Sequence, residues 1–480
     1  MINEQNYTML CDFYQLTMGN GYFKTKHADR IAYFDLFFRR VPDGGGYAVC
    51  AGLEQVIDYI ENLRFSDEDI EFLKTKKIFS EEFLEYLRNF KFEGDVFAIP
   101  EGTPVFPNEP LITVRAPAIQ AQLIETMLLL LVNHQSLIAT KASRIVRAAE
   151  GRAISEFGSR RAQGTAGAVL GARAAYIGGC SGTACVMSDE VYGIPATGTM
   201  AHSWVQMFDS ELDAFEEYCC VYPHGAVLLV DTYNVLKSGV PNAIKAFDKI
   251  LKPLGARPVG IRLDSGDIAY LSIEARKMLD AAGYPDCKIV ASNSLDEYII
   301  RDLIKQGAKI DSFGVGERLI TASSEPVFGG VYKLCATEEN GVITPKIKIS
   351  ENVIKITNPH YKKIYRIFDN KTGKAEADLI CLYDETIDES QPLELFDPDY
   401  TWKRKTVTDF TAKELQVQIF AKGKLVYQPP KIDEIKSYCA EQMSTLWESV
   451  LRFENPHRYY VDLSQKLWNI KHKLLADKGE

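Results

Sequence analysis

Charged side chains gather directly after one short apolar run in the middle of the chain. Arg262, Asp264 and Asp267 follow residues 258–261 and form the densest charged group at any predicted strand end. In a cleft, an arginine here can bind a carboxylate or a phosphate through two hydrogen bonds, and a carboxylate two residues later can hold Mg²⁺ or a sugar hydroxyl. Alternatively, the group is a salt-bridged cap of the following helix, with Asp264 or Ser265 as its N-cap.

Two further residues at predicted strand ends could take part in such chemistry. Asp231 directly follows the uncharged apolar run 225–230, and the same two interpretations apply to it. His202 lies within Thr197–Trp204 (TGTMAHSW), whose small residues would let a ligand approach the backbone. A lone histidine at a strand end is more often structural, but the other six histidines lie in plainer settings. His202 is therefore a candidate functional residue.

The candidate phosphate-binding features are arginines and glycines. The pair Arg160–Arg161 follows residues 156–159 and indicates either a solvated face or an anion site. Gly314–Gly316 comes after the last apolar run, where backbone N–H groups and the start of a helix favour an anion. The sequence contains no Walker A motif, and no GxGxxG motif follows a predicted strand.

The elements that must position these residues recur at regular intervals. Apolar runs lie at 225–230, 258–261, 288–291 and 309–313, and each is followed by polar residues and a helical pattern. The polar segments are separated by 31, 31 and 21 residues, which are lengths typical of βα units. Polar groups at successive strand ends build the active site of a TIM barrel, although a doubly wound sheet has a similar period. We favour an irregular TIM-like (β/α) barrel over residues 136–335.

The flanking segments predict a second domain. Residues 1–135 do not alternate strand and helix regularly, and the proline-rich stretch 96–114 is typical of short edge strands and turns. Residues 336–480 predict a strand-rich segment with a helical tail, and strands this short need partners. The predicted fold class is α/β: the barrel, with a second α/β-mixed domain built from the N- and C-terminal parts.

The overall composition limits the function classes. With 46% hydrophobic and 25% charged residues the chain is an ordinary globular protein, and its net charge of -10 argues against nucleic acid as a partner. We expect no membrane partner, because the longest aliphatic run has six residues and a spanning helix needs about 20. Ten scattered cysteines without a CxxC pair, together with an N-terminus unlike a signal peptide, predict reduced thiols and a cytoplasmic protein.

Several segments together resemble the nicotinate phosphoribosyltransferase family in order and spacing. The chain shares with this family the following motifs: 12–18, 156–161, 198–204, 230–233, 262–267, 292–293 and 314–316. The resemblance spans nearly the whole chain. It implies transfer of a phosphoribosyl group from phosphoribosyl pyrophosphate to nicotinate in NAD salvage.

The resemblance also implies how the site is assembled. It implies a homodimer in which Tyr14 and the partner subunit's Phe157 sandwich the pyridine ring, although pattern alone makes Tyr14 a core aromatic. Arg262 and Thr199 would bind near the nicotinate. The ribose-phosphate and pyrophosphate would be held by Arg160, Asn293, Gly314 and Gly316.

His202 matches the histidine that the family phosphorylates with ATP. Hydrolysis of the phosphohistidine would drive the condensation, and ATP would occupy the phosphate cradle that phosphoribosyl pyrophosphate uses later. Mg²⁺ and arginines would draw the pyrophosphate away electrostatically. The metal ligands stay unassigned, and Asp231 and Asp264 are kept as catalytic candidates.

Two positions bear on specificity and on the phosphate site. Relatives that use nicotinamide carry an aspartate where this chain has Ala184, so nicotinate is the expected substrate. Glu317 stands where other branches place threonine near the phosphates, which leaves its role open. In the loop around Asn358, the chain also departs from the family's Pro-Gly.

The alternatives are a different substrate or a different protein class. Nicotinamide is the main rival substrate, and quinolinate fits less well because its enzymes lack the phosphorylated histidine. A hydrolase using Asp231 with Asp264 or Asp267 would leave the glycine loop unexplained. A non-catalytic barrel relative should have lost reactive residues, yet His202 and Arg262 are present.

Overall fold

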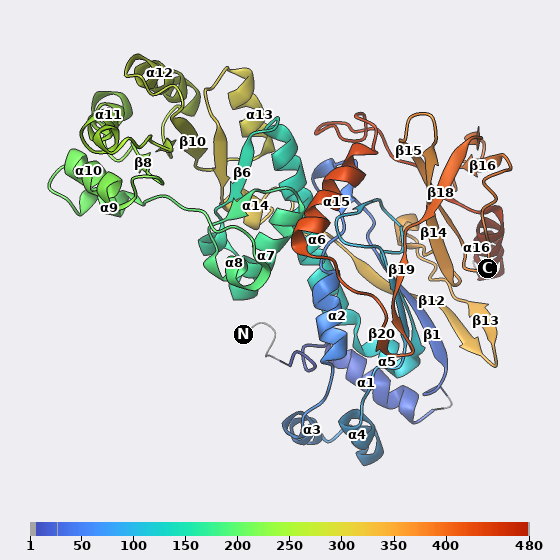
Figure 1. The fold of residues 1–480 in the computed structure, drawn as a ribbon. Helices are drawn as coiled ribbons and strands as arrows, with labels where there is room; N and C mark the ends of the chain where they lie inside the picture. The colour runs from blue at the N-terminus through green and yellow to red at the C-terminus, as the bar shows by residue number, and fades with distance from the viewer. Residues whose placement is uncertain (1–5, 26, 479–480) are drawn as a thin grey trace. The chain divides into compact units, whose positions relative to one another are not determined.

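The computed structural model describes residues 6–25 and 27–478. The chain divides into two compact units: a central unit of residues 138–326, and a terminal unit of residues 1–137 and 327–480. In Figure 1 the central unit runs from cyan-green to yellow, and the terminal unit combines the blue start with the orange and red end. The terminal unit therefore joins segments from both ends of the sequence.

A six-stranded parallel sheet organises the central unit, with strand order β7-β6-β11-β10-β9-β8. Its strands are mostly buried apolar runs, as expected for a parallel sheet covered on both faces. They are β6 (Ala153–Glu156), β7 (Gly182–Thr183), β8 (Val227–Leu229), β9 (Gly260–Leu263), β10 (Lys288–Ser292) and β11 (Ser312–Val315).

Two of these strands are shifted along the chain from their predicted positions. β9 begins two residues after the predicted run 258–261, and β11 begins three residues after the start of 309–313. As a consequence Arg262 lies inside β9 and Gly314 inside β11, whereas both were expected to follow their strands. The register is set by pairing with β10, since Val290 pairs with both Arg262 and Ser312.

The sheet is open between β7 and β8, so only the coarser α/β expectation is met by the described residues. β7 has two residues, and its outer edge is occupied by the loop that follows α8 (Val186–Tyr192). Thr183 N donates to Pro195 O at 3.0 Å, and Thr197 N donates to Thr183 O at 2.7 Å. This loop takes the hydrogen bonds that a neighbouring strand would need to close a barrel.

Helices connect the strands of the central unit. They are α7 (Thr165–Ile177), α8, α9 (His202–Gln206), α10 (Glu211–Val221), α11 (Val240–Ala246), α12 (Ile268–Ala281), α13 (Glu297–Lys305) and α14 (Glu317–Ile320). The N-cap of α12 is Asp267, whose Oδ1 accepts from Tyr270 N at 3.1 Å. The alternative that Asp264 or Ser265 caps this helix is therefore wrong, and Asp264 is available for the site.

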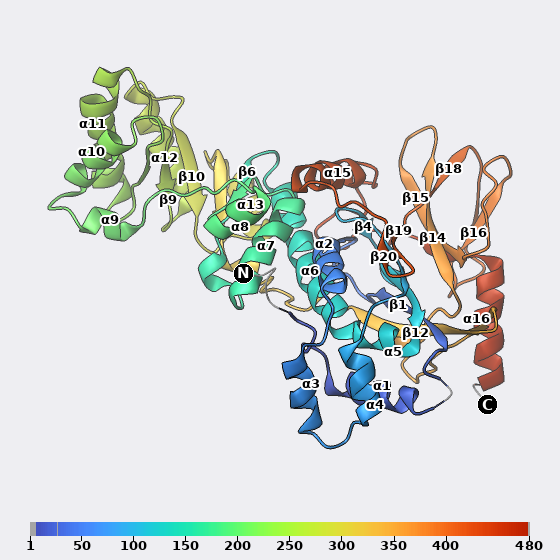
Figure 2. The same cartoon turned by 60° about the horizontal axis from the view of Figure 1, so that its bottom comes forward.

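The terminal unit is built on an antiparallel sheet and on a smaller mixed sheet, in which β15 and β21 run parallel. Its seven-stranded sheet has the order β13-β12-β1-β5-β3-β19-β20, and a four-stranded sheet has the order β18-β14-β15-β21. The strands of the larger sheet are β1 (Ile31–Phe37), β3 (Asp95–Ala98), β5 (Ile112–Pro117), β12 (Val331–Glu339), β13 (Val342–Pro345), β19 (Val417–Ala421) and β20 (Lys424–Leu425). Those of the smaller one are β14 (Lys362–Asp369), β15 (Ala375–Leu382), β18 (Phe410–Glu414) and β21 (Val461–Leu463). Because β1 pairs with both β5 and β12, the two ends of the chain share one sheet (Figure 2).

The chain also forms two short strand pairs and several further helices. The remaining strands are β2 (Ala48–Val49), β4 (Pro104–Val105), β16 (Leu393–Phe396) and β17 (Arg404–Val407). The helices outside the central unit or reaching into it are α1 (Phe13–Phe23), α2 (Leu53–Glu61), α3 (Asp67–Lys74), α4 (Glu81–Arg88), α5 (Ala118–Leu123), α6 (Glu125–Ala148), α15 (Ile432–Ser444) and α16 (Gln465–Lys478).

One stretch of the described chain, residues 118–148, is long and apolar enough to cross a membrane by length and composition. The sequence predicted no such stretch, because its aliphatic runs are interrupted by small and polar residues. In the structure 72% of the most apolar window is buried within the protein. Burial of this kind is typical of the core helix of a globular protein.

Candidate functional site

A cavity of about 480 Å³ lies at the carboxyl ends of β6, β7, β9, β10 and β11. Loops at these ends supply the lining residues, as the topology of a parallel sheet requires. Nine of the twelve predicted site residues line this cavity: Phe157, Arg160, Thr199, Arg262, Asp264, Asn293, Gly314, Gly316 and Glu317. The structure therefore brings together residues that are up to 160 positions apart in sequence.

Arg262 is the most highly connected side chain of the cavity. Its Nη2 donates to Asp264 Oδ1 at 2.9 Å, and its Nε donates to Ser292 Oγ at 2.9 Å. Its Nη1 donates to Thr199 Oγ1 at 3.2 Å. The guanidinium also lies 5.9 Å from the ring centroid of Phe157. These contacts fix a cation at the cavity wall, and its charge attracts a carboxylate or phosphate ligand.

Ser292 connects two of the charged residues, and its role was not predicted. It accepts from Arg262 and donates its hydroxyl hydrogen to Asp264 Oδ1. The sequence placed Ser292 within a motif at a strand end but gave no sign that it bridges two neighbouring strands. Only the pairing of β9 with β10 makes that contact.

His202, Asp231 and Asp264 form a second group beside the cavity. His202 is the first residue of α9, and its Nδ1 lies 3.1 Å from Thr232 Oγ1. Its Nε2 lies 3.9 Å from Asp231 Oδ1 and 3.8 Å from Asp264 Oδ2. His202 and Asp231 do not themselves line the cavity, but Asp264 does, so the two groups share one carboxylate.

Hydrogen bonds from the described residues hold only one carboxylate oxygen of Asp231. Asp231 Oδ2 accepts from Asp264 N at 3.0 Å and from Ser265 Oγ at 2.6 Å. Asp231 Oδ1 is buried and accepts no hydrogen bond from any residue that the structure describes. A buried carboxylate oxygen without a donor is rare in proteins, so this atom points to a ligand or a cation.

The position of Phe157 explains why residues 314 and 316 are glycines. A Cβ on Gly314 would lie 2.4 Å from Phe157 Cδ2, and a Cβ on Gly316 would lie 3.1 Å from Phe157 O. Phe157 N also donates to Val315 O at 2.8 Å. The glycines thus let the ring of Phe157 pack onto β11, between that strand and Arg262.

Glu156 supports the same loop. The sequence places this residue in a motif without assigning it a role. Its carboxylate accepts from Gly158 N and, at 2.7 Å, from Thr183 Oγ1. Burial raises the pKa of Glu156, and the two hydrogen bonds oppose that rise. A buried acid at the end of β6 therefore joins β6 to β7 and fixes the loop that carries Phe157 and Arg160.

Two predicted residues lie at the solvent edge of the cavity. Arg160 is exposed, as expected for a cation that meets a ligand from solution. Glu317 begins α14, and its Oε2 lies 3.8 Å from Arg161 Nε, with both side chains 63% exposed. Glu317 thus offsets one of the cations at the rim of a cavity that three arginines line.

Tyr14 belongs to the terminal unit. It lies in α1, is 44% exposed, and donates its hydroxyl hydrogen to Glu125 Oε2 at 2.9 Å. Partial burial and the neighbouring Glu125 raise the pKa of Tyr14. The expectation of a core aromatic is wrong, because the ring of Tyr14 reaches the surface of its own unit.

The carboxylate oxygens beside His202 can hold Mg²⁺ only if a bound ligand supplies further oxygen atoms to the metal. Within residues 6–25 and 27–478, no three His, Cys, Asp or Glu side chains cluster as a metal site. Asp231 Oδ1 and Asp264 Oδ2 nevertheless both face His202 Nε2. Mg²⁺ is commonly held by one or two carboxylates and by phosphate oxygens of the substrate, so this pair fits it.

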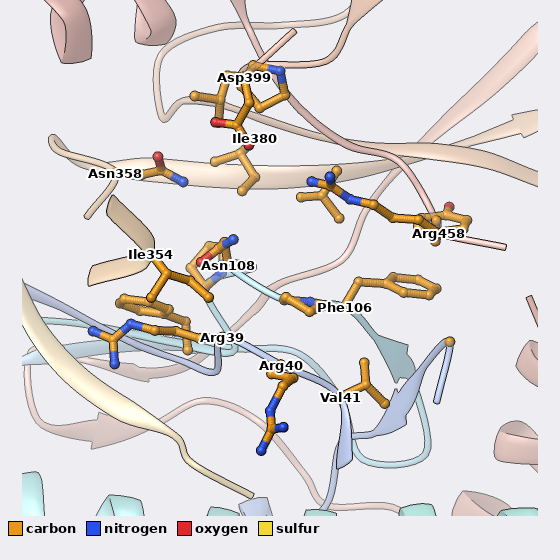
Figure 3. Close-up of a pocket in the computed structure, with 18 of the residues that line it drawn as sticks. Arg39, Arg40, Val41, Phe106, Asn108, Ile354, Asn358, Ile380, Asp399 and Arg458 are labelled. Atoms are coloured by element: carbon orange, nitrogen blue, oxygen red, sulfur yellow. The ribbon is translucent and has the colours of Figure 1, made fainter. Parts of the chain in front are cut away.

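A larger cavity of about 740 Å³ lies in the terminal unit (Figure 3). Arg39, Arg40 and Arg458 line it together with Asn108 and Asp399. None of the residues predicted from the sequence lies there. Size alone does not identify an active site, and the smaller cavity is the one that the predicted site residues line.

The comparisons with known proteins cover most of the chain. Residues 9–133 match the nicotinate phosphoribosyltransferase N-terminal domain, 152–363 the nicotinate phosphoribosyltransferase family, and 361–471 its C-terminal domain. Nicotinate phosphoribosyltransferase of Bacillus subtilis is 46% identical over 96% of this chain and 93% of its own length. That of Dictyostelium discoideum is 37% identical over 98% of this chain and 88% of its own length.

Solved structures agree with these matches. The crystal structure of human nicotinic acid phosphoribosyltransferase has a TM-score of 0.84 and 29% identity, covering 97% of this chain and 99% of that one. Nicotinate-nucleotide pyrophosphorylase from Pyrococcus furiosus, with a TM-score of 0.70 and 24% identity, covers 92% of this chain and 96% of its own and shares the fold. By sequence and by structure along nearly its whole length, this chain belongs to the nicotinate phosphoribosyltransferase family.

Proposed function

We propose that this chain joins nicotinate to the ribose of phosphoribosyl pyrophosphate, with ATP as the energy source. The products are nicotinate mononucleotide, pyrophosphate, ADP and phosphate, and one water is consumed. Family membership supports the phosphoribosyl transfer. The observation that carries the ATP coupling is His202 Nε2, which faces two carboxylates beside an arginine-lined cavity.

The phosphorylation step follows from the surroundings of His202. Donation of the Nδ1 hydrogen to Thr232 Oγ1 would leave the lone pair on Nε2. Nε2 then attacks the γ-phosphorus of ATP, an N–P bond forms, and the bond to the ADP oxygen breaks. Water later cleaves the N–P bond and releases phosphate. Mg²⁺ bound by Asp231 and Asp264 would supply charge neutralisation for the phosphates during both transfers.

The phosphoribosyl transfer needs positioning and charge more than acid-base chemistry. The pyridine nitrogen of nicotinate carries no hydrogen, so its bond to the ribose C1 forms without loss of a proton. The C1–oxygen bond to pyrophosphate breaks at the same carbon. Arg262 and Thr199 would bind the nicotinate carboxylate, and the remaining cavity residues would hold the phosphates: Arg160, Asn293, Gly314, Gly316 and Glu317 through its effect on Arg161.

Nicotinate is favoured over nicotinamide by Ala184. This residue lines the cavity, and its backbone N donates to Glu156 O at 2.8 Å. A carboxylate at this position would accept from a carboxamide and would repel nicotinate. The neutral methyl group leaves Arg262 as the charge that selects the substrate.

We further propose a homodimer with shared active sites. Tyr14 and the partner subunit's Phe157 would enclose the pyridine ring. Four large apolar side chains around α1 are 38–51% exposed: Leu10, Phe13, Tyr14 and Met18. An exposed apolar face of this kind is typical of a surface that another subunit covers.

Three further features complete the proposal. The central unit is an irregular, incompletely closed (β/α) barrel, whose cyclic strand order β6 to β11 is interrupted once, between β7 and β8. The functional domains are residues 1–135, 136–335 and 336–480. The protein acts in the cytoplasm, where its ten free cysteines stay reduced.

Phosphate transfer from labelled Mg·ATP tests the proposed coupling. We expect one phosphate per subunit in an acid-labile, alkali-stable linkage, absent from the His202→Ala variant. His224→Ala, which changes an exposed histidine of the same unit, should keep the label. Label remaining in His202→Ala would overturn the coupling.

A product assay tests the substrate. Nicotinate, nicotinamide and quinolinate are each offered with phosphoribosyl pyrophosphate, with and without ATP. Only nicotinate should be converted efficiently, and ATP should stimulate the wild type. His202→Ala should lose the ATP stimulation more completely than the transfer itself. Equal turnover of nicotinamide would contradict the substrate assignment.

A further inference from the structure

The turn after β10 carries unusual backbone strain at the cavity. Asn293 and Ser294 both line the cavity, and both have left-handed backbone angles, with φ of 90° and 46°. Two consecutive non-glycine residues in this region are uncommon, because side chains rarely adopt these backbone angles. Such a turn persists only where the surrounding structure holds it in place.

The residue that holds this turn to the next loop is Arg318. Asp296 follows the turn and is the N-cap of α13, with Oδ1 accepting from Tyr298 N at 3.1 Å and from Ile299 N at 2.9 Å. Its other oxygen, Oδ2, forms an ion pair with Arg318 Nη1. Arg318 lies in α14, directly after the Gly314–Gly316 loop.

The far end of the turn is also anchored. Glu297, the first residue of α13, is fully buried, and its Oε1 accepts from Lys141 Nζ and Arg144 Nε, each at 2.9 Å. α13 is thereby fixed to α6. The pairing of Ser292 with Gly314 fixes the strand ends, and with the helix fixed the Asp296–Arg318 pair links the turn at 293–294 to Gly316 and Glu317 beyond β11.

We infer that Arg318 is a positioning residue for the phosphate-binding half of the cavity, acting through Asp296. This inference rests on the proposed function. Arg318 does not line the cavity. Its side chain is 40% exposed, so the ion pair contributes little to global stability. Its effect is instead to keep the backbone groups of Asn293 and Gly316 at the spacing that a pyrophosphate group requires.

The test compares two single variants with their combination. Arg318→Met removes the ion pair, and Asp296→Asn removes it while keeping an N-cap acceptor. Each should raise the KM for phosphoribosyl pyrophosphate roughly tenfold. The KM for nicotinate should stay within about twofold, because a displaced phosphate loop leaves Arg262 in place. The double variant should be no worse than either single one, since both remove the same contact.

Two further variants exclude a merely structural effect. Arg318→Lys keeps the charge and should recover part of the affinity, with the thermal midpoint of unfolding unchanged. Lys277→Met removes a surface ion pair with Glu274 in α12 and should leave both KM values unchanged. Equal losses for both substrates, additive effects in the double variant, or no change in Arg318→Met would overturn the inference.

Binding of inorganic pyrophosphate separates this inference from the proposed function. Calorimetry should give a dissociation constant roughly tenfold weaker for Arg318→Met than for the wild type. If the wild type binds pyrophosphate but makes no nicotinate mononucleotide, the proposed function fails while the inference stands. If both proteins bind pyrophosphate equally, the inference fails.

Discussion

Nε2 of His202 lies 3.9 Å from Oδ1 of Asp231, a buried oxygen that accepts no hydrogen bond from any described residue. The Asp231 side chain is 1% exposed, whereas that of His202 is 41% exposed. One negative oxygen is therefore held against an accessible imidazole nitrogen. Its charge can stabilise positive charge that develops at that nitrogen, since no described residue donates a hydrogen bond to this oxygen.

Asp231→Asn should slow the phosphorylation of His202 by roughly a hundredfold. The amide keeps an acceptor for Asp264 N and Ser265 Oγ, so the loop stays in place, but the charge is lost. Single-turnover transfer from labelled ATP measures this rate. Asp267→Asn is the matched control, because it removes the same charge nearby while asparagine still caps α12. A normal rate in Asp231→Asn would show that the charge is not needed.

The structure brings nine of the twelve predicted site residues to one cavity, and it meets the fold prediction only at the level of the α/β class. Asp264 could be predicted because polar residues after buried strands of a parallel sheet meet at one edge, whereas Arg262 lies inside β9 and the role of Asn293 came from the family resemblance. The contacts of Ser292 and Arg318 could not be predicted, because they join neighbouring loops whose spacing depends on strand register. The open edge of the sheet could not be predicted either, because it arises from the short strand β7, whose edge Pro195–Thr197 occupies.

Ala184→Asp should weaken nicotinate binding and favour nicotinamide. A carboxylate in the cavity repels the nicotinate carboxylate and competes for Arg262, so the KM for nicotinate should rise about tenfold or more. Steady-state assays with both substrates measure the change.

The neutral variant Ala184→Asn has nearly the same shape and serves as the control for that experiment. It should raise the KM for nicotinate much less than the aspartate does. If both variants lose nicotinate to the same extent, the cause is side-chain volume, and the electrostatic argument for specificity is wrong.

Asp462 of β21 should make the stability of the terminal unit depend on pH. Burial, together with repulsion from Asp397, raises the pKa of Asp462 from 3.8 to about 7. Below pH 3.8 the group is protonated in both the folded and the unfolded state. Between pH 3.8 and 7 the unfolded chain releases this proton first, so the contribution of Asp462 to stability falls as the pH rises.

Asp462→Asn removes this titration and should therefore gain thermal stability relative to the wild type as the pH increases from 5 to 8. Differential scanning calorimetry at several pH values measures the difference between the two midpoints. Asp388→Asn changes a fully exposed aspartate and should leave the difference constant near neutral pH. A difference for Asp462→Asn that does not grow with pH would contradict the raised pKa.

Mixing two inactive variants tests whether the active sites are shared between subunits. Tyr14→Ala and Phe157→Ala should each lose most activity, because the pyridine ring would lose one of its two stacking partners. In a mixed dimer with shared sites, one site carries both substitutions and the other carries neither. Random exchange of subunits then restores about a quarter of the wild-type activity, because half of the dimers are mixed and each has one intact site.

Recovery should require subunit exchange, so crosslinking each variant before mixing should abolish it. If Tyr14 and Phe157 acted within one subunit, every site in the mixture would lack one ring, and no activity would return.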